Sequence, residues 1–373
     1  MAAPAPARGP LREIALLFLR LGLTAFGGPA AHIALLEDEA VRRRKWLSRE
    51  SFLDLLGATN LIPGPNSTEM AIHLGYLRGG PAGLVLAGAC FILPASLLSA
   101  ALAWAYVRFG GVPGAQGILS GIKPAIIVIV VQAVVALSRA ALKTRWLAAL
   151  AVASAAAVLL GLNELLVLAL AGAAASAPRL RGRREGFLAA VPAAAAAAAP
   201  ASVGLWPLFL AFAKIGSVLF GSGYVLLAFL RADLVAQRHW LTEAQLLDAV
   251  AVGQFTPGPV SSTATFIGYL LRGPAGAAVA TAGMFAPAFV FVALSGPLVP
   301  RIRRSPAAGA FLDGVNAASL ALMAVVAAQL GRAAIVDWVT AGIAVASAVA
   351  VLRLRVNSIW LVLGGGLAGA LLR

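Results

Sequence analysis

Two stretches decide the fold of this chain: Asn-Leu-Ile-Pro-Gly-Pro-Asn-Ser-Thr at residues 60–68 and Gln-Phe-Thr-Pro-Gly-Pro-Val-Ser-Ser at residues 254–262. In each, Pro-Gly-Pro interrupts an apolar, helix-favouring run, because proline lacks a backbone N–H group and glycine permits a sharp change of direction. The hydroxyl-rich segment after each break predicts the start of a new helix. Inside a membrane, such a break is tolerated only where it is buried in protein or lines a cavity.

The composition indicates that the surrounding solvent is lipid. Of the 373 residues, 61% are hydrophobic and 12% are charged, whereas a soluble protein carries about twice that charged fraction. Several apolar stretches are long enough, singly or as pairs, to cross a bilayer core of about 30 Å, and their continuity excludes a β-barrel. They are residues 84–107, 118–137, 147–177, 187–212 and 275–299. We therefore predict an all-α, multi-pass integral protein of the cytoplasmic (inner) membrane, in contact with the lipid bilayer.

Other function classes lack a motif. The single cysteine, Cys90, excludes a disulfide within the chain and a thiol cluster. The net charge of +15 is explained mainly by basic cytoplasmic loops, with attraction of an anionic substrate as the alternative. No pattern favours nucleic-acid binding. Metal-ligand spacing, a nucleophile–base pair and a phosphate-cradling loop are all missing, so we expect no metal, no cofactor, no enzyme and no ATP-driven pump.

The second half of the chain repeats the first in order. The breaks share an offset of 258 − 64 = 194, and after the loss of one residue the offset becomes 193. Matched landmarks are Phe26-Gly27 with Phe220-Gly221, Trp46-Leu47-Ser48 with Trp240-Leu241-Thr242, Asp54 with Asp248, Gly75-Tyr76 with Gly268-Tyr269, and Pro81 with Pro274. The pattern predicts two homologous membrane repeats, an organisation typical of secondary transporters that bind substrate between repeats.

We divide the chain accordingly into a disordered Pro/Ala-rich tail at 1–10, a first membrane repeat at 11–145, connecting helices with a basic and Ala-rich linker at 146–206, a second repeat at 207–332, and C-terminal helices at 333–373. The pieces that flank each Pro-Gly-Pro are too short to span the membrane, so we predict discontinuous or re-entrant helices. The basic residues after 300 contrast with the nearly bare counterpart around Arg108 and favour inverted copies, although parallel copies remain an alternative.

Matched cations lie inside the first apolar helix of each copy. Arg20 corresponds to Lys214, since 214 − 20 = 194. A charge at such depth is costly and is normally paired or functional. Each cation could reach an interface or pair with a carboxylate such as Asp54 or Asp248. Alternatively, the two cations surround a pseudo-twofold axis and suit a dianion.

The breaks supply the other half of a candidate anion site. Each new helix begins with unpaired N–H groups and the positive end of a helix dipole, and neighbouring hydroxyl and amide groups add neutral donors. The alternative is a plain helix break with capping hydroxyls. The candidate substrate-binding residues are Arg20, Lys214, Gly27, Gly28, Gly221, Gly223, Pro63, Gly64, Pro65, Asn66, Ser67, Thr68, Pro257, Gly258, Pro259, Ser261, Ser262 and Thr263.

Four residues are candidates for coupling transport to another ion. Glu69 corresponds to Thr263, so only one copy carries the acid, which could move a proton or pair with Arg78 or His73. Lys123, matched by Asn316, is either an interfacial lysine or a functional cation. The other two candidates are Asp54 and Asp248.

These motifs resemble the chromate ion transporter family, long-chain two-domain type. The resemblance is carried by Phe26-Gly27-Gly28-Pro29, Trp46-Leu47, Pro63-Gly64-Pro65 with Asn66-Ser67-Thr68, Gly75-Tyr76, and their second-copy partners. It implies halves of opposite orientation and a protein that exports chromate and confers chromate resistance, with sulfate as a competing look-alike. Alternatives are a transporter of sulfate or another oxyanion, and an anion channel. A homodimer is compatible with either.

Overall fold

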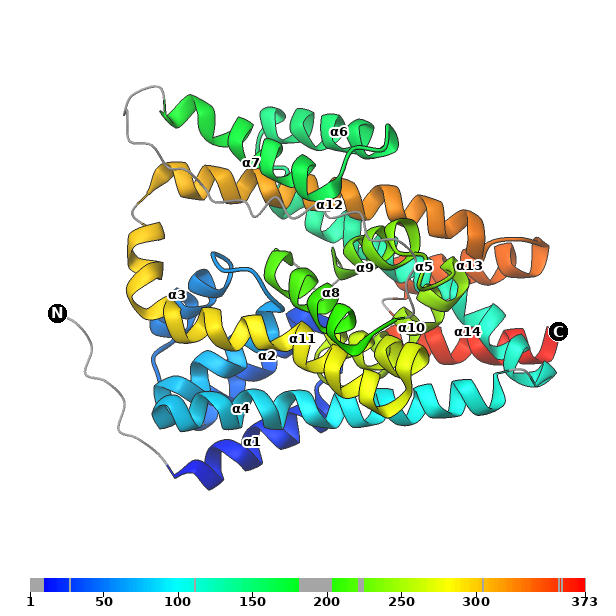
Figure 1. Cartoon of the computed structure of the whole chain (residues 1–373), viewed down its shortest axis with the longest axis horizontal. Coiled ribbons are helices and arrows are strands. Elements are labelled where there is room, and N and C mark those ends of the chain that lie inside the picture. The colour runs from blue at the N-terminus through cyan, green and yellow to red at the C-terminus, as the bar shows by residue number, and fades with distance from the viewer. Residues whose placement is uncertain are drawn as a thin grey trace.

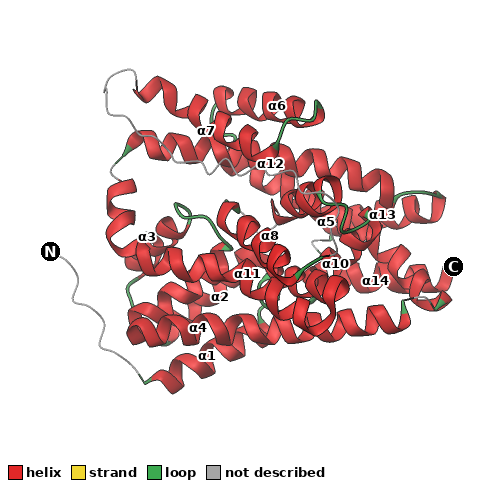
Figure 2. Ribbon diagram, viewed as in Figure 1, coloured by secondary structure: helices red, strands yellow, loops and turns green. Residues whose placement is uncertain are grey.

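The computed structural model describes residues 10–26, 28–110, 112–180, 203–220, 225–303, 305–354, 356 and 358–372. Throughout this part of the chain the secondary structure is helical and contains no strand (Figure 2). The predicted all-α class is therefore confirmed. The predicted tail before Pro10, most of the basic and Ala-rich linker, and three of the candidate glycines, Gly27, Gly221 and Gly223, lie outside the described residues.

The helices follow the two-copy order (Figure 1). The first half contains α1 (Leu11–Thr24), α2 (Gly28–Glu37), the π-helix η1 (Asp38–Arg43), α3 (Arg49–Thr59), α4 (Asn66–Phe109), α5 (Pro113–Ala141), α6 (Arg145–Leu159) and α7 (Glu164–Leu180). The second half contains α8 (Leu205–Val218), α9 (Leu226–Leu230), the π-helix η3 (Arg231–Gln237), α10 (Glu243–Phe255), the 3₁₀-helix η4 (Val260–Ser262), α11 (Thr263–Arg303), α12 (Pro306–Ala334), α13 (Trp338–Leu352) and α14 (Ser358–Leu372).

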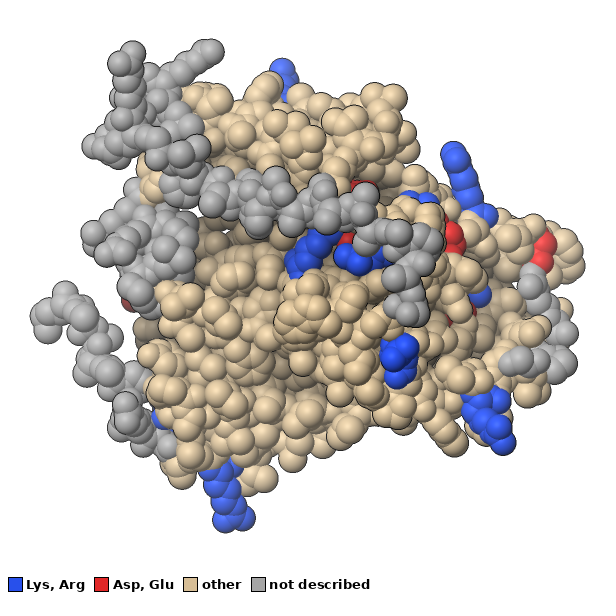
Figure 3. Space-filling model, in the orientation of Figure 1, with Lys and Arg blue, Asp and Glu red and all other residues tan. Residues whose placement is uncertain are grey.

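Four segments of the described chain are long and apolar enough to cross a membrane: Asn66–Phe109, Ala115–Ala141, Val260–Ser295 and Pro306–Ala334. Large apolar side chains also cover the outside; Leu97 is 69% exposed and Trp206 is 67% exposed. Figure 3 shows an outer face made mainly of uncharged residues, with few Lys and Arg side chains. Such an extensive apolar surface is unfavourable in water and is suited to lipid.

The Pro-Gly-Pro segments break the helices as predicted. The first lies between the end of α3 and the start of α4, and the second between α10 and η4. Gly64 and Gly258 have φ values of 148° and 88°, in the region that favours glycine. The predicted N-cap at Ser48 is also present, because the Ser51 N–H group donates to Ser48 Oγ at 3.1 Å.

Both long helices bend at matched glycines. Within α4, Gly80 has φ 61° and ψ −151°, and within α11, Gly273 has φ 60° and ψ −153°. Their separation, 273 − 80 = 193, is the offset found after the breaks in the sequence. Each long helix therefore consists of a short first part, which starts at a Pro-Gly-Pro break, and a long second part, which is able to span.

The first copy doubles back on itself before the long part of α4. Glu13, near the start of α1, meets Arg44 and Trp46, which follow η1, and Arg78, which precedes the bend in α4. The chain thus returns twice to the end of the molecule from which α1 starts. The turn after α1 and the Pro-Gly-Pro turn both lie at the other end of these short helices, away from the start of α1.

The long helices of the two copies pack side by side and run in opposite directions. Near the start of α4, His73 Nε2 lies 3.4 Å from Ser295 Oγ, far along α11. Gly88 packs against the ring of Phe289. Farther along α4, the Tyr106 ring meets the Phe266 ring edge-on, with centroids 5.3 Å apart. The order of contacts is reversed along α11, which makes the pair antiparallel.

Two hairpins are exchanged between the copies. Helices α6 and α7 lie along α12, at the top of Figure 1, whereas α13 and α14 lie along α5. The contacts are close because small residues line them: Gly314 of α12 packs on the backbone of Ala171, and Gly121 of α5 packs on the backbone of Gly365. The predicted connecting and C-terminal helices therefore join the copies together.

Candidate functional site

The two Pro-Gly-Pro turns bind to opposite copies through a reciprocal pair of hydrogen bonds. The Gly64 N–H group donates to the Leu219 carbonyl at 2.7 Å, and the Gly258 N–H group donates to the Ala25 carbonyl at 2.8 Å. Ala25 and Leu219 are the C-cap residues of α1 and α8. Helix ends leave carbonyl groups without intrahelical partners, and these bonds satisfy one at each end. Each turn is thereby fixed to the other copy.

We call the two turns with the helix starts that follow them tip 1 (residues 63–69) and tip 2 (residues 257–263). At tip 1, the Pro65 carbonyl accepts the N–H groups of Thr68 and Glu69, at 2.8 and 3.0 Å, so the helix begins there. At tip 2, the Pro259 carbonyl accepts the Ser262 N–H group at 2.9 Å. The structure thus brings both predicted helix starts to the interface between the copies.

Hydroxyl groups are buried at both tips. Ser67, Thr68, Ser261, Ser262 and Thr263 are each less than 5% exposed. Some of these hydroxyl groups form hydrogen bonds within the protein and others do not. At tip 2, Ser99 of α4 donates to Ser262 Oγ at 3.2 Å, and Thr263 donates to the Val260 carbonyl at 2.8 Å. At tip 1, Thr68 Oγ1 is buried with no hydrogen-bond partner.

The Asn66 amide at tip 1 is half satisfied. Its Nδ2 donates to Asn60 Oδ1 at 2.6 Å, whereas its own Oδ1 is buried without a partner. Buried polar groups without partners are rare in native proteins and point to a polar ligand or to function. Tip 1 therefore retains hydrogen-bonding capacity that tip 2 has largely used within the protein.

Glu69 is the largest difference between the tips. Its side chain is fully buried, and neither carboxyl oxygen has a hydrogen-bond partner. The carboxyl group folds back against Gly64, where an added Cβ would collide with Glu69 Oε1. In the second copy, the matched Thr263 donates its hydroxyl to the Val260 carbonyl of η4. A buried acid therefore touches the backbone of one tip only.

The structure does not bring the matched cations, Arg20 and Lys214, to the tips as free charges. Arg20 pairs with Glu39, and Lys214 Nζ lies 2.5 Å from Asp233 Oδ1. A second cation joins each cluster: Arg44 pairs with Glu39, and Arg238 Nε lies 2.8 Å from Asp233 Oδ2. Arg43 also pairs with Glu39, with Nη1 3.4 Å from Oε1.

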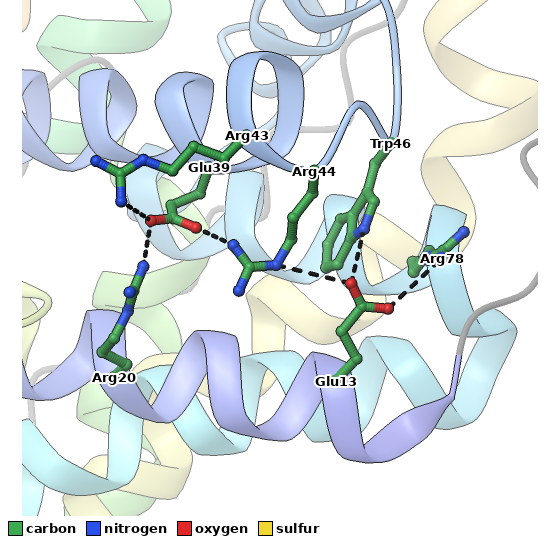
Figure 4. A network of polar contacts seen from close by, with 7 residues as sticks. All are labelled: Glu13, Arg20, Glu39, Arg43, Arg44, Trp46 and Arg78. Atoms are coloured by element: carbon green, nitrogen blue, oxygen red, sulfur yellow. Dashed lines mark hydrogen bonds and ion pairs between the residues drawn. The ribbon is translucent and has the colours of Figure 1, made fainter.

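Figure 4 shows the ion pairs between Glu39 and its arginines. Beside them, Glu13 contacts Arg44, Trp46 and Arg78. The partners of the cations are Glu39 and Asp233, not Asp54 or Asp248, the carboxylates considered from the sequence. Glu39 and Asp233 are themselves matched, since 233 − 39 = 194. That offset is the signal that could have found them.

Asp248 takes part in a different buried ion pair. Lys123 Nζ lies 3.3 Å from Asp248 Oδ1, and Tyr106 donates its hydroxyl to Oδ2 at 2.9 Å. This cluster joins α4 and α5 of the first copy to α10 of the second. The matched acid, Asp54, is exposed on α3, and Asn316 replaces the lysine. Lys123 and Asp248 thus form a charge contact between the copies, whereas Asp54 does not lie at an equivalent buried position.

Matched ion pairs with reversed signs connect the returning helices in each copy. In the first copy, Arg49 Nε lies 3.3 Å from Glu37 Oε1, and in the second, Arg231 Nη2 lies 2.6 Å from Glu243 Oε1. The positions correspond, because 231 − 37 and 243 − 49 both equal 194. Acid and base have exchanged places while the contact is retained.

A small polar cavity lies beside Lys214 and Asp233, where the turn between α6 and α7 contributes Asn163 and Glu164. Its volume of about 20 Å³ is enough for a water molecule and too small for a tetrahedral oxyanion. The exchanged hairpin therefore reaches the cation cluster of the second copy.

Comparison with known proteins identifies the family of this chain. A family model described as chromate transporter matches residues 12–176 and 206–370, one region in each half. The chain belongs to the chromate transporter family. The two matched regions run through the α6–α7 and α13–α14 hairpins, so the family unit includes the exchanged helices. No solved structure matches the chain.

Curated relatives cover nearly the whole chain. It is 35% identical to the chromate transport protein of Cupriavidus metallidurans, over 96% of this chain and 92% of the relative. It is 33% identical to the chromate transport protein of Pseudomonas aeruginosa, over 99% and 93% of the two chains. It is also 32% identical to a probable chromate transport protein of Synechococcus elongatus, over 88% and 87%. The chain is a multi-pass membrane protein of the inner membrane.

Proposed function

We propose that this family member is a secondary transporter that exports chromate from the cytoplasm and thereby confers chromate resistance. The observation that carries the proposal is the reciprocal bonding of Gly64 to Leu219 and of Gly258 to Ala25, which places two helix starts at one interface between two copies. Transporters built from repeats bind substrate at such interfaces. The names of the curated relatives supply chromate as the substrate.

We propose further that the copies are inverted, with short helices that enter the membrane from opposite faces and meet at the tips. The antiparallel packing of α4 on α11 supports this arrangement. Charge indicates the orientation of the first copy: the η1 turn carries Arg43 and Arg44, and the α5–α6 turn carries Lys143 and Arg145. By the positive-inside rule these turns face the cytoplasm.

The proposed oxyanion site lies between tip 1 and tip 2. Helix N-termini favour anions, and the buried hydroxyls of Ser67, Thr68 and Ser261 add neutral donors that bind without holding too tightly. Gly28 starts α2 and offers one more helix N-terminus, and the motif glycines Gly27, Gly221 and Gly223 extend the candidate set. Alternating access then consists of one copy rocking against the other about the clasped tips.

In this transport cycle, the two cations exchange one anionic partner for another. Arg20 and Lys214 are held by Glu39 and Asp233, so a passing dianion would compete with these carboxylates for the cations. Asp54, Asp248 and Lys123 remain candidates for coupling. We propose no enzymatic activity, because the sequence carries no nucleophile, metal or cofactor motif. Sulfate, another tetrahedral dianion, is a competing substrate, and a homodimer is a compatible assembly.

The test is flux of radiolabelled chromate and sulfate in proteoliposomes, comparing wild type with Arg20→Gln and Lys214→Gln. The expected result is saturable chromate flux that falls at least several-fold in both variants. Normal transport by both variants would remove the cations from the mechanism. Flux that does not saturate would favour a channel, and flux of sulfate in preference to chromate would change the substrate.

A further inference from the structure

Glu69 has an environment that a charged carboxylate does not tolerate. It is fully buried, both oxygens lack a hydrogen-bond partner, and no cation of the described chain lies within ion-pair distance. Moving an unpaired charge into such a site is strongly unfavourable, whereas the neutral acid is far less so. The geometry alone therefore favours a protonated Glu69 in this conformation.

The surrounding elements do not change this conclusion. Titratable and charged groups with described side chains on the helices packed against α4 are Arg12, Glu13 and Arg20 on α1, His32 and Glu37 on α2, Arg49, Glu50 and Asp54 on α3, Glu243 and Asp248 on α10, and Tyr269 and Arg272 on α11, with His73 one turn along α4 itself. Glu13, Arg20, Arg49, Glu243 and Asp248 are each paired with other side chains. Glu69 takes part in no ion pair among the described residues.

Glu69 is also placed where a bound oxyanion would detect its charge. Its carboxyl group contacts Gly64, whose N–H group holds the Leu219 carbonyl of the other copy. Thr68 Oγ1 and Asn66 Oδ1, the partnerless groups of tip 1, are its neighbours in the chain. An ionised Glu69 would repel a dianion at the tips, whereas the neutral acid would not, and could donate a hydrogen bond to it.

We propose that Glu69 holds one proton while the oxyanion is bound and releases this proton when the oxyanion leaves, so that proton and dianion are carried as a unit. This inference rests on the proposed oxyanion site at the tips. It predicts that the transported complex has one negative charge fewer than the free dianion. It also accounts for the acid being present in one copy only, because a single proton per transport cycle needs a single carrier.

The experiment measures protons and chromate together. Proteoliposomes that contain the full-length protein and a fluorescent pH indicator are loaded with chromate at alkaline pH, where free chromate is a dianion. Wild type is expected to move about one proton with each chromate. Glu69→Gln, which mimics the neutral acid, is expected to move chromate without a proton. Glu50→Gln, which removes an exposed carboxyl from α3, serves as the control and should match wild type.

Chromate movement by wild type without any proton would overturn the inference and leave the proposed function standing. The absence of chromate movement in wild type would overturn both. Equilibrium binding to purified protein provides a second measurement in case Glu69→Gln does not transport. Because binding requires the protonated acid, wild-type affinity should fall, by at most tenfold per pH unit, once the pH is high enough to ionise Glu69 in the free protein, whereas the affinity of Glu69→Gln should not fall. Equal pH dependence in the two proteins would contradict the inference.

Discussion

Tip 1 and tip 2 have the same backbone arrangement and differ in their side chains. Each has a Pro-Gly-Pro turn whose glycine N–H group bonds to the end of the other copy's first helix. Tip 1 then carries Glu69 and the partnerless Thr68, whereas tip 2 carries Thr263, whose hydroxyl bonds to the Val260 carbonyl. The comparison teaches that duplication preserves the main-chain scaffold of the interface. The titratable group is confined to one side of it.

The largest expected effect comes from the matched acids Asp248 and Asp54. Asp248→Ala leaves the partly buried Lys123 without its carboxylate, and breaking a buried pair in this way costs at most about 3–5 kcal/mol. Asp54→Ala changes an exposed side chain and should alter stability by about 0.5 kcal/mol or less. Thermal unfolding of the purified variants in detergent measures both changes in stability. Equal losses would show that the two acids are equivalent, against the structure.

The next effect concerns the glycines of the tips. Gly64→Ala and Gly258→Ala each force an L-residue into a φ region that favours glycine, at a cost of about 1–3 kcal/mol. At Gly64 the added Cβ also collides with Glu69, whereas at Gly258 it lies 3.0 Å from Ala95 Cβ. Chromate flux and the midpoint temperature of thermal unfolding should both decrease.

A double variant separates the two causes at tip 1. Glu69→Ala should recover part of the stability lost in Gly64→Ala, because it removes the colliding carboxyl group, and should recover none of that lost in Gly258→Ala. Additive losses in both combinations would mean that Glu69 does not pack on Gly64.

The smallest effect concerns the sign-reversed pairs. Glu37→Arg places two arginines together in the first copy and should cost about 1 kcal/mol or less, because Arg49 is 73% exposed and solvent screens the charges. Glu37→Arg combined with Arg49→Glu reproduces the arrangement of Arg231 and Glu243 and should restore stability. Chemical denaturation can resolve the difference. A double variant no more stable than the single one would show that the contact does not matter.

Local signals in the sequence predicted much of this structure. The constant offset revealed the duplication, Pro-Gly-Pro revealed the breaks, and Ser48 revealed a helix start, because each depends on residues that are close in the chain. The exchanged hairpins and the bonds of Gly64 and Gly258 to the opposite copy were not predicted. They join segments far apart in sequence through backbone groups and small residues, which leave no local pattern. The partners of Arg20 and Lys214 share the offset and could have been found by it.

Equilibrium binding of radiolabelled chromate to the purified protein tests whether tip 1 and tip 2 together bind one oxyanion. Ser67→Ala and Ser261→Ala remove matched buried hydroxyls, since 261 − 67 = 194, and a lost hydrogen bond of about 1 kcal/mol weakens binding about fivefold. We expect one chromate per chain and weaker binding in each variant. Two chromate ions per chain, or binding that depends on one tip alone, would contradict it.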